Sequence, residues 1–205
     1  MRDLDKALTD IRAMRSQIAR GTEFRGYGPV TVAMTGLLAM AAAWVQSQWI
    51  EAPSQAMQDY LGLWVATAAL SVIVIGMEVI TRTRRIHSEL AEEMILAAVW
   101  QLLPAMAAGV LLTFVLLQYA PQSLWMLPGL WQIILSLGVF ASCRTLPAPL
   151  VICALWYLAT GLACLAWAQN EHALSPWAMG ASFGIGQLLA AALLQIVGAG
   201  DEEDA

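Results

Sequence analysis

Carboxylate and amide side chains occur inside long apolar stretches of this sequence, where polar groups are costly and often functional. Glu78 lies close to one end of such a stretch, and an acid in this position is a candidate proton or cation site. Three amides lie deeper in other stretches and could line a polar cavity: Gln101, Gln132 and Gln187. Structural alternatives exist for all four. For Glu78 the favoured one is an ion pair with Arg82 on the same helix face, and for the amides it is hydrogen bonding between helices.

The sequence GASFG, centred on Ser182, matches two different motifs. As G-x-S-x-G it resembles a nucleophile elbow, which needs a strand-to-helix turn and a histidine base. The segment lies within an apolar stretch expected to be helical, and His87 and His172 both lie outside such stretches. As G-x-x-x-G, Gly180 and Gly184 form a face for close helix packing. The packing interpretation is favoured, and an intramembrane hydrolase is a remote alternative.

Other catalytic and metal-binding patterns are missing from the sequence. The three cysteines form no C-x-x-C pair, and no histidine lies in an apolar stretch to bind haem or a metal ion. Lys6 is the only lysine, so no phosphate-binding P-loop is present. We therefore predict a protein that is not an enzyme and has no catalytic, metal or cofactor site.

The composition indicates a membrane protein, because 60% of the 205 residues are hydrophobic and only 12% are charged, against about 25% charged in soluble domains. Six apolar stretches approach or exceed the ~20 residues that a helix needs to cross a membrane, and lipid excludes open sheets. The fold class predicted is all-α, a polytopic protein with six transmembrane helices. The spans are expected at about 28–50, 60–81, 94–119, 123–143, 147–168 and 175–198.

Positive charge is distributed unequally between the two ends of these spans. All ten Lys and Arg residues precede span one or lie between spans two and three or four and five. Cytoplasmic loops carry such an excess, so both termini are expected in the cytoplasm. Four tryptophans are expected at the opposite, outer boundary, as in an aromatic belt: Trp49, Trp125, Trp167 and Trp177.

Three regions follow from this pattern. Residues 1–25 are expected to form an amphipathic cytoplasmic helix, residues 26–198 the six-helix transmembrane domain, and residues 199–205 an acidic cytoplasmic tail. Residues 82–93, between spans two and three, are also expected to be helical. The apolar face of the first helix either lies in the membrane interface or binds a partner helix. Its residues have a helical period: Leu4, Ile11, Met14 and Ile18.

A weak internal repeat suggests three related helical hairpins. Thr35–Gly36–Leu37 resembles Thr160–Gly161–Leu162, with Ala108–Gly109–Val110 as a looser copy. The return spans carry a second set of similar residues: Gly62–Leu63–Trp64, Gly129–Leu130–Trp131 and Gly180–Ala181. Glycine, leucine and tryptophan are common in membrane helices, so chance similarity explains the pattern equally well.

Four stretches carry a resemblance when taken together: Asp10–Arg12, Phe24–Pro29, Leu124–Trp131 and Leu174–Gly180. They resemble a family of small six-span bacterial inner-membrane proteins with no assigned activity. The resemblance covers nearly the whole chain. It implies a bacterial cytoplasmic membrane and assigns no functional residue.

Two functional hypotheses follow. The first is a non-enzymatic accessory or regulatory protein that binds a protein partner through its cytoplasmic face or within a membrane complex. The alternative is a channel or transporter for a small solute, with a polar cavity inside the membrane. The expected partners are the lipid bilayer and either another protein or further copies of this chain, and no nucleic acid.

Overall fold

The computed structural model describes residues 28–50, 52–86, 89–143, 147–167 and 172–203, and this part of the chain is helical with short turns. Six of its helical segments are long and apolar enough to cross a membrane, so the predicted all-α, six-span fold is confirmed. The elements, in chain order, are α2 (Pro29–Trp49), α3 (Met57–Ile86), α4 (Glu89–Tyr119), η1 (Pro121–Met126), α5 (Leu127–Ser142), η2 (Ala148–Leu150), α6 (Val151–Trp167) and α7 (Pro176–Glu203).

Prolines begin several of these helices. Pro29 occupies the first position of α2, after Gly28 as N-cap, where its missing N–H has no helical partner to lose. The fourth span, expected as one helix, is instead a 3-10 helix followed by α5. Pro128 lies in the first turn of α5, and such a proline begins a helix without breaking its hydrogen bonds.

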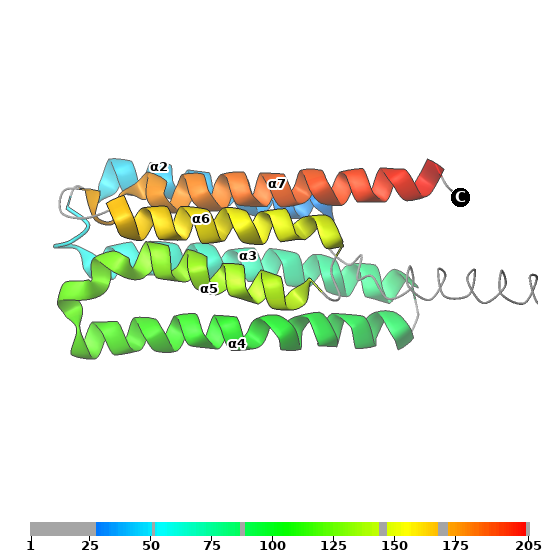
Figure 1. Cartoon of the computed structure of the whole chain (residues 1–205), viewed down its shortest axis with the longest axis horizontal. Helices are drawn as coiled ribbons and strands as arrows, with labels where there is room; N and C mark the ends of the chain where they lie inside the picture. The colour runs from blue at the N-terminus through cyan, green and yellow to red at the C-terminus, as the bar shows by residue number, and fades with distance from the viewer. Residues whose placement is uncertain (1–27, 51, 87–88, 144–146, 168–171, 204–205) are drawn as a thin grey trace, which may run out of the picture.

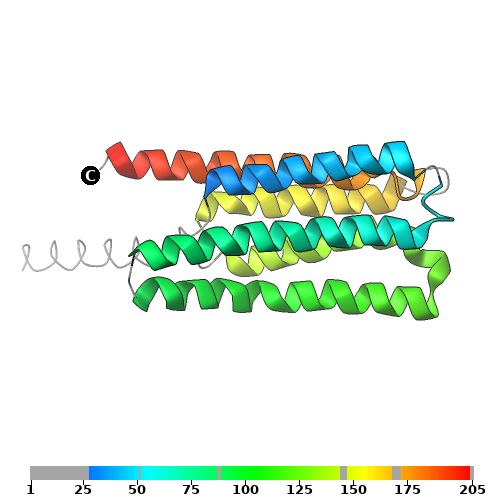
Figure 2. The same ribbon diagram turned by 180° about the vertical axis from the view of Figure 1, so that it is seen from behind.

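The six spans form a ring of roughly parallel rods, so the long axis of the bundle is the natural direction of the membrane normal (Figures 1 and 2). Around the ring the order is α2, α7, α6, α5, α4 and α3. The closest packing joins α2 to α7 and α5 to α6, whereas α3 touches α4 only weakly. Two pairs of tightly packed helices therefore hold the bundle together.

These two pairs use the same contact. A Cβ added to Gly36 of α2 would lie 2.9 Å from the carbonyl oxygen of Gly184 and 3.0 Å from the Cβ of Gln187, both in α7. One added to Gly161 of α6 would lie 2.9 Å from the carbonyl oxygen of Gly129 and 3.1 Å from the Cβ of Gln132, both in α5. The absence of a side chain lets the backbones approach this closely.

Matching glycine contacts therefore occur in two helix pairs, in a register that differs from the one compared in the sequence. Gly129 corresponds by its contacts to Gly184, not to Gly180 as the sequence comparison paired them. The pattern does not extend to α3 and α4, because a Cβ on Gly62 meets no atom within 4 Å and one on Gly109 meets only Trp131 of α5, at 3.9 Å.

Helices α3, α4 and α7 extend beyond the membrane-compatible part of the bundle at one end, on the right in Figure 1. Apart from Glu78, the charged residues at this end begin at Arg82 in α3 and at Asp201 in α7, and in α4 they end at Glu93. The first five residues of α4, Glu89–Glu93, thus precede its apolar run, a length of about 8 Å at 1.5 Å per residue. The helical character expected for residues 82–93 is confirmed up to Ile86 and from Glu89 onward; residues 87–88 lie outside the described part.

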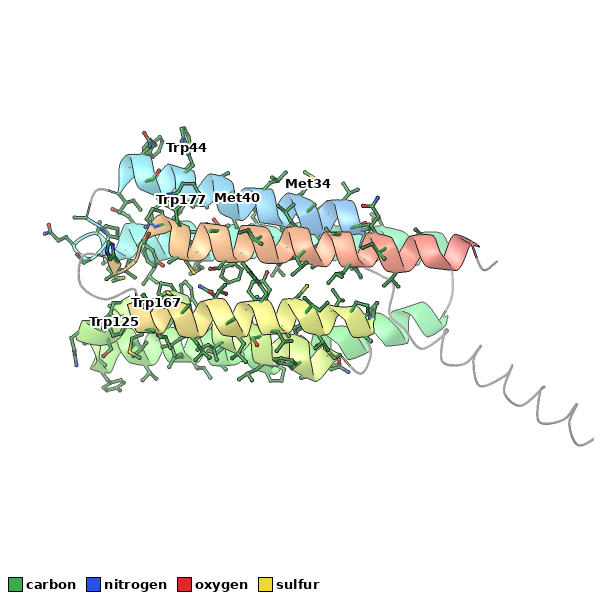
Figure 3. The ribbon with its side chains drawn as sticks, turned by 45° about the horizontal axis from the view of Figure 1, so that its top comes forward. Met34, Met40, Trp44, Trp125, Trp167 and Trp177 are labelled. Carbon is green, nitrogen blue, oxygen red and sulfur yellow. The ribbon has the colours of Figure 1, made fainter. Side chains whose placement is uncertain are left out.

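The outer surface of the bundle is apolar, as lipid requires. In the Trp100–Tyr119 stretch of α4 no residue is buried, and Val110 and Leu111 are widely exposed. The end opposite the extensions is rich in tryptophan (Figure 3). The labelled residues there are Trp44, Trp125, Trp167 and Trp177.

Candidate functional site

A buried hydrogen-bond network ties three segments together at the tryptophan-rich end of the bundle. The Gln46 side chain of α2 is fully buried. Its Nε2 donates to the carbonyl oxygen of Leu174 at 2.8 Å, and its Oε1 accepts from Nε1 of Trp64 in α3, also at 2.8 Å. Both ends of the amide are used, so Gln46 joins α2 to α3 and to the segment before α7.

Leu174 is held in an uncommon backbone conformation by this network. Its φ is +59°, the only positive value for a non-glycine residue among the described residues, and such a conformation costs about 1–3 kcal/mol. Its side chain is 1% exposed and packs in a cluster with Tyr60, Trp64 and Met179. The burial of this side chain and the bond from Gln46 offset the backbone cost and close the interior at this end.

Deeper in the bundle, polar atoms lie buried between α5, α6 and α7. Gln132 of α5 is fully buried, and its Nε2 donates to the carbonyl oxygen of Ala178 in α7 at 3.0 Å. Its Oε1 has no protein partner, nor do the hydroxyl oxygens of Ser136 and Tyr157. A fourth such atom, the Tyr60 hydroxyl, lies towards the tryptophan-rich end.

The four polar residues that the sequence singled out lie at different places. Gln132 packs at the α5–α6 interface and Gln187 at the α2–α7 interface. The carboxylate of Glu78 occupies the space beside Gly28, at the start of α2, where a Cβ would overlap its Oε1 atom. Gln101 is half-buried on α4. The structure therefore distributes these side chains over separate helix contacts.

The two glycines of the GASFG sequence lie against α2. A Cβ on Gly180 would overlap that of Ala43, and one on Gly184 would lie 2.7 Å from Cγ of Met40. Ser182 between them donates its hydroxyl to the carbonyl of Ala178 in its own helix, at 2.8 Å. This bond occupies the proton that a general base would have to remove from a nucleophile.

Two open hollows lie at the tryptophan-rich end. One, of about 390 Å³ between α6 and α7, is lined by residues that include Cys164, His172 and Ser182. The other, of about 480 Å³, is lined by residues that include Trp125 and Leu174. Neither is lined by Gln132 or Gln187. His172 and Ser182 thus share a hollow, a proximity that the sequence did not suggest.

Among the described residues, no group of three His, Cys, Asp or Glu side chains lies close enough together to bind a metal ion. The three cysteines are free thiols at separate positions in α6 and after α5. The proposed partner-binding face of residues 1–25 lies outside the described part of the chain. It comprises Leu4, Ile11, Met14 and Ile18.

Comparisons with known protein families, with curated proteins and with solved structures found no match to this chain. The six apolar helices define a multi-pass helical membrane protein. The resemblance to a bacterial six-span family stays a prediction.

Sequence inspection missed three side chains that the structure makes prominent: Gln46, Tyr157 and Leu174. Gln46 carried a usable signal, because it is an amide three residues before the end of an apolar span. Leu174 carried none, because its importance rests on a backbone angle and a long-range hydrogen bond.

Proposed function

We propose that this chain is a non-enzymatic accessory or regulatory protein of the bacterial inner membrane, which holds a protein partner at its cytoplasmic end. Charge supports the proposal. Three charged residues, Glu51, Asp59 and Glu171, lie towards the opposite end. All others lie in the N-terminal segment, in the C-terminal part of α3, at the start of α4, between α5 and α6, or in the C-terminal tail. By the positive-inside rule this end faces the cytoplasm.

The extension of α3, α4 and α7 beyond their apolar stretches is the observation that carries the proposal. A helix that only spans the membrane needs about 20 residues, whereas these helices have 30, 31 and 28. We infer that the additional turns form a helical platform outside the membrane, next to the charged ends of the chain. Rigid helices with charged residues are a suitable surface for a protein partner.

The interior supports the same proposal because its amides connect helices. Gln46 bonds α2 to α3 and to Leu174, and Gln132 bonds α5 to α7. Hydrogen bonds of this kind typically hold membrane bundles together. The amides of Gln46 and Gln132 are then explained by assembly, without a catalytic role.

Affinity purification of the full chain from native membranes in mild detergent tests the proposal. We expect a protein partner in a fixed ratio to the chain, and its loss on deletion of residues 2–20 or in the double variant Glu92→Gln/Glu93→Gln at the start of α4. Glu171→Gln, a neutralisation in the opposite loop, is the matched control and should retain the partner. Recovery of the same complex from all variants would contradict the proposal.

A small-solute channel is the second candidate, favoured by the unpartnered polar atoms of Gln132, Ser136 and Tyr157. Such atoms can line a path for polar solutes in a membrane bundle. The two candidates differ in their requirements. A channel transports its solute in proteoliposomes without any partner, whereas an accessory protein shows no flux and purifies as a complex.

A further inference from the structure

The hollow of about 390 Å³ between α6 and α7 is large enough to hold a ligand, because small-molecule sites begin at about 300 Å³. It is lined by one face of α6, one face of α7 and the segment that precedes α7. On α6 the lining residues are Thr160, Ala163, Cys164 and Trp167, and on the other side they are His172, Ser175, Ala178 and Ser182. One molecule in this cavity therefore contacts both helices.

The hollow runs along the two helices for about 10 Å. Thr160 and Trp167 lie seven positions apart, as do Ser175 and Ser182, and each residue of a helix adds 1.5 Å. Helices α6 and α7 run in opposite directions (Figure 1). Trp167 and Ser175 therefore lie at one end of the hollow, its mouth, and Thr160 and Ser182 lie at the other, its deep end.

A tryptophan bridges the two helices at the deep end. Trp156 lies one turn before Thr160 in α6, and its Nε1 donates to the carbonyl oxygen of Ser182 in α7 at 2.8 Å. Between this bridge and the mouth, the lining includes Ala163 on α6 and Ala178 on α7. Their short side chains leave the space between the helices unfilled.

The hollow borders the surface of the bundle that faces lipid. Leu162 and Trp177, which precede Ala163 and Ala178 in the sequence, are 54% and 52% exposed. Trp167 and Trp177 are among the tryptophans at this end (Figure 3), and such residues lie at the level of the lipid headgroups. The hollow therefore starts at headgroup level and continues into the hydrocarbon of the membrane.

The deep end of the hollow is suited to hydrocarbon. The hydroxyl of Thr160 donates to the carbonyl oxygen of Trp156 at 2.9 Å, and that of Ser182 donates to the carbonyl oxygen of Ala178 at 2.8 Å. Such bonds within a helix use the proton of each hydroxyl. An apolar chain can therefore lie against both side chains without leaving a donor unsatisfied.

The mouth of the hollow carries hydrogen-bond donors instead. His172 is exposed and Ser175 is half-buried, and an imidazole N–H and a hydroxyl can both donate. The phosphate of a lipid headgroup accepts such hydrogen bonds, which are stronger than those between neutral groups. A molecule with a hydrocarbon chain and a phosphate group matches the order of these groups along the hollow.

We propose that a phospholipid binds in this hollow, with one acyl chain between α6 and α7 and its phosphate hydrogen-bonded to His172 and Ser175. The depth of about 10 Å lies within the ~15 Å of hydrocarbon in one leaflet, so a chain that starts at headgroup level fills it. The site lies at the end opposite the proposed partner-binding end. Each of the two proposals can therefore fail without the other.

Photocrosslinking of the full chain in nanodiscs tests the proposal. The discs consist of phosphatidylcholine with a minor fraction of phosphatidylcholine that carries a diazirine in its acyl chain, and labelled peptides are identified by mass spectrometry. We expect labelling per residue to be several-fold higher in residues 160–167 and 175–182 than in Trp100–Tyr119 of α4, where no residue is buried. Equal labelling of these segments would show bulk lipid only and would overturn the proposal.

Filling the hollow should prevent binding. Ala163→Leu and Ala178→Leu each place a larger apolar side chain in its lining and should reduce the labelling of α6 and α7 several-fold. Ala107→Leu, the same change at an exposed position of α4, is the matched control and should leave this labelling unchanged. Because the two alanines belong to different helices, misfolding of one variant leaves the other as a test. Undiminished labelling in a folded hollow variant overturns the proposal.

The phosphate contact has a separate test at the mouth. The double variant His172→Ala/Ser175→Ala removes both donors and should reduce labelling by the phospholipid probe several-fold. A diacylglycerol with the same diazirine chain but no phosphate should label the parent protein weakly and the double variant to the same extent. Equal labelling of the parent by the two probes, or full phospholipid labelling of the double variant, contradicts the proposed phosphate contact.

Discussion

At the scale of single residues, the fully buried amide of Gln46 makes two long-range hydrogen bonds. One amide accepts from the Trp64 indole and donates to the carbonyl of Leu174. That second bond holds a leucine at positive φ in the closure of the tryptophan-rich end. The side chain therefore joins α2, α3 and the segment before α7 through two hydrogen bonds in a place that excludes water.

Gln46→Leu tests this role. Leucine has a similar volume but leaves the Trp64 N–H and the Leu174 carbonyl buried without a partner, which should cost about 2 kcal/mol. In thermal unfolding we expect Tm to fall by roughly 4–8 °C. Gln48→Leu is the matched control, because Gln48 is exposed and its amide contacts Ser47 Oγ at 3.4 Å. Equal effects of the two variants would contradict the role.

The sequence identified some of the buried polar residues but not the groups to which they bond. An amide in an apolar stretch is visible as an anomaly, so Gln132 could be singled out and the structure shows its bond to α7. Its partner could not be predicted, because the acceptor is a backbone carbonyl 46 residues away. The burial of Tyr157 against Phe183 and Gly186 could not be predicted either, because it depends on the relative rotation of two helices, which composition does not specify.

At the scale of helices, two pairs are joined by matching glycine contacts. Gly36 faces Gly184 and Gln187, and Gly161 faces Gly129 and Gln132. In each pair one helix presents a glycine and the other a glycine carbonyl. Association of membrane helices depends on such close packing because lipid is as apolar as the side chains.

Adding a methyl group should have different effects on stability at a tightly packed glycine and at a glycine with no neighbouring atoms. Gly161→Ala places a Cβ 2.8 Å from Cγ1 of Ile133 and 2.9 Å from the Gly129 carbonyl, which should destabilise the bundle by about 1–3 kcal/mol in thermal unfolding. Gly62→Ala on α3 meets no atom within 4 Å. This control should be neutral or stabilising by up to about 1 kcal/mol, since alanine favours helix. A stable Gly161→Ala protein would show that close approach is dispensable.

Helix positions were predictable because their cause is local. A run of about 20 apolar residues specifies a span without reference to the rest of the chain, so all six were found. The register of the glycine pattern was not, because Gly180 and Gly184 are equally plausible counterparts of Gly129 by sequence alone. The contact of Gly36 with the Gly184 carbonyl, which matches the contact of Gly161 with the Gly129 carbonyl, separates them.

At the scale of the whole molecule, the two ends of the bundle differ in character. One end is closed by the buried Leu174 and surrounded by tryptophans (Figure 3). At the other, α3, α4 and α7 continue past their apolar stretches beside the charged segments. We propose that the partner binds at this extended end, which requires that the end faces the cytoplasm.

Cysteine accessibility in intact cells measures that orientation directly. After replacement of Cys143, Cys153 and Cys164 by alanine, single cysteines are introduced by Gln55→Cys, Ser88→Cys and Ala205→Cys and treated with a membrane-impermeant maleimide. If the extended end is cytoplasmic, position 55 is labelled in intact cells, and positions 88 and 205 are labelled only after the cells are permeabilised. Labelling of positions 88 and 205 in intact cells, with position 55 protected, would contradict it.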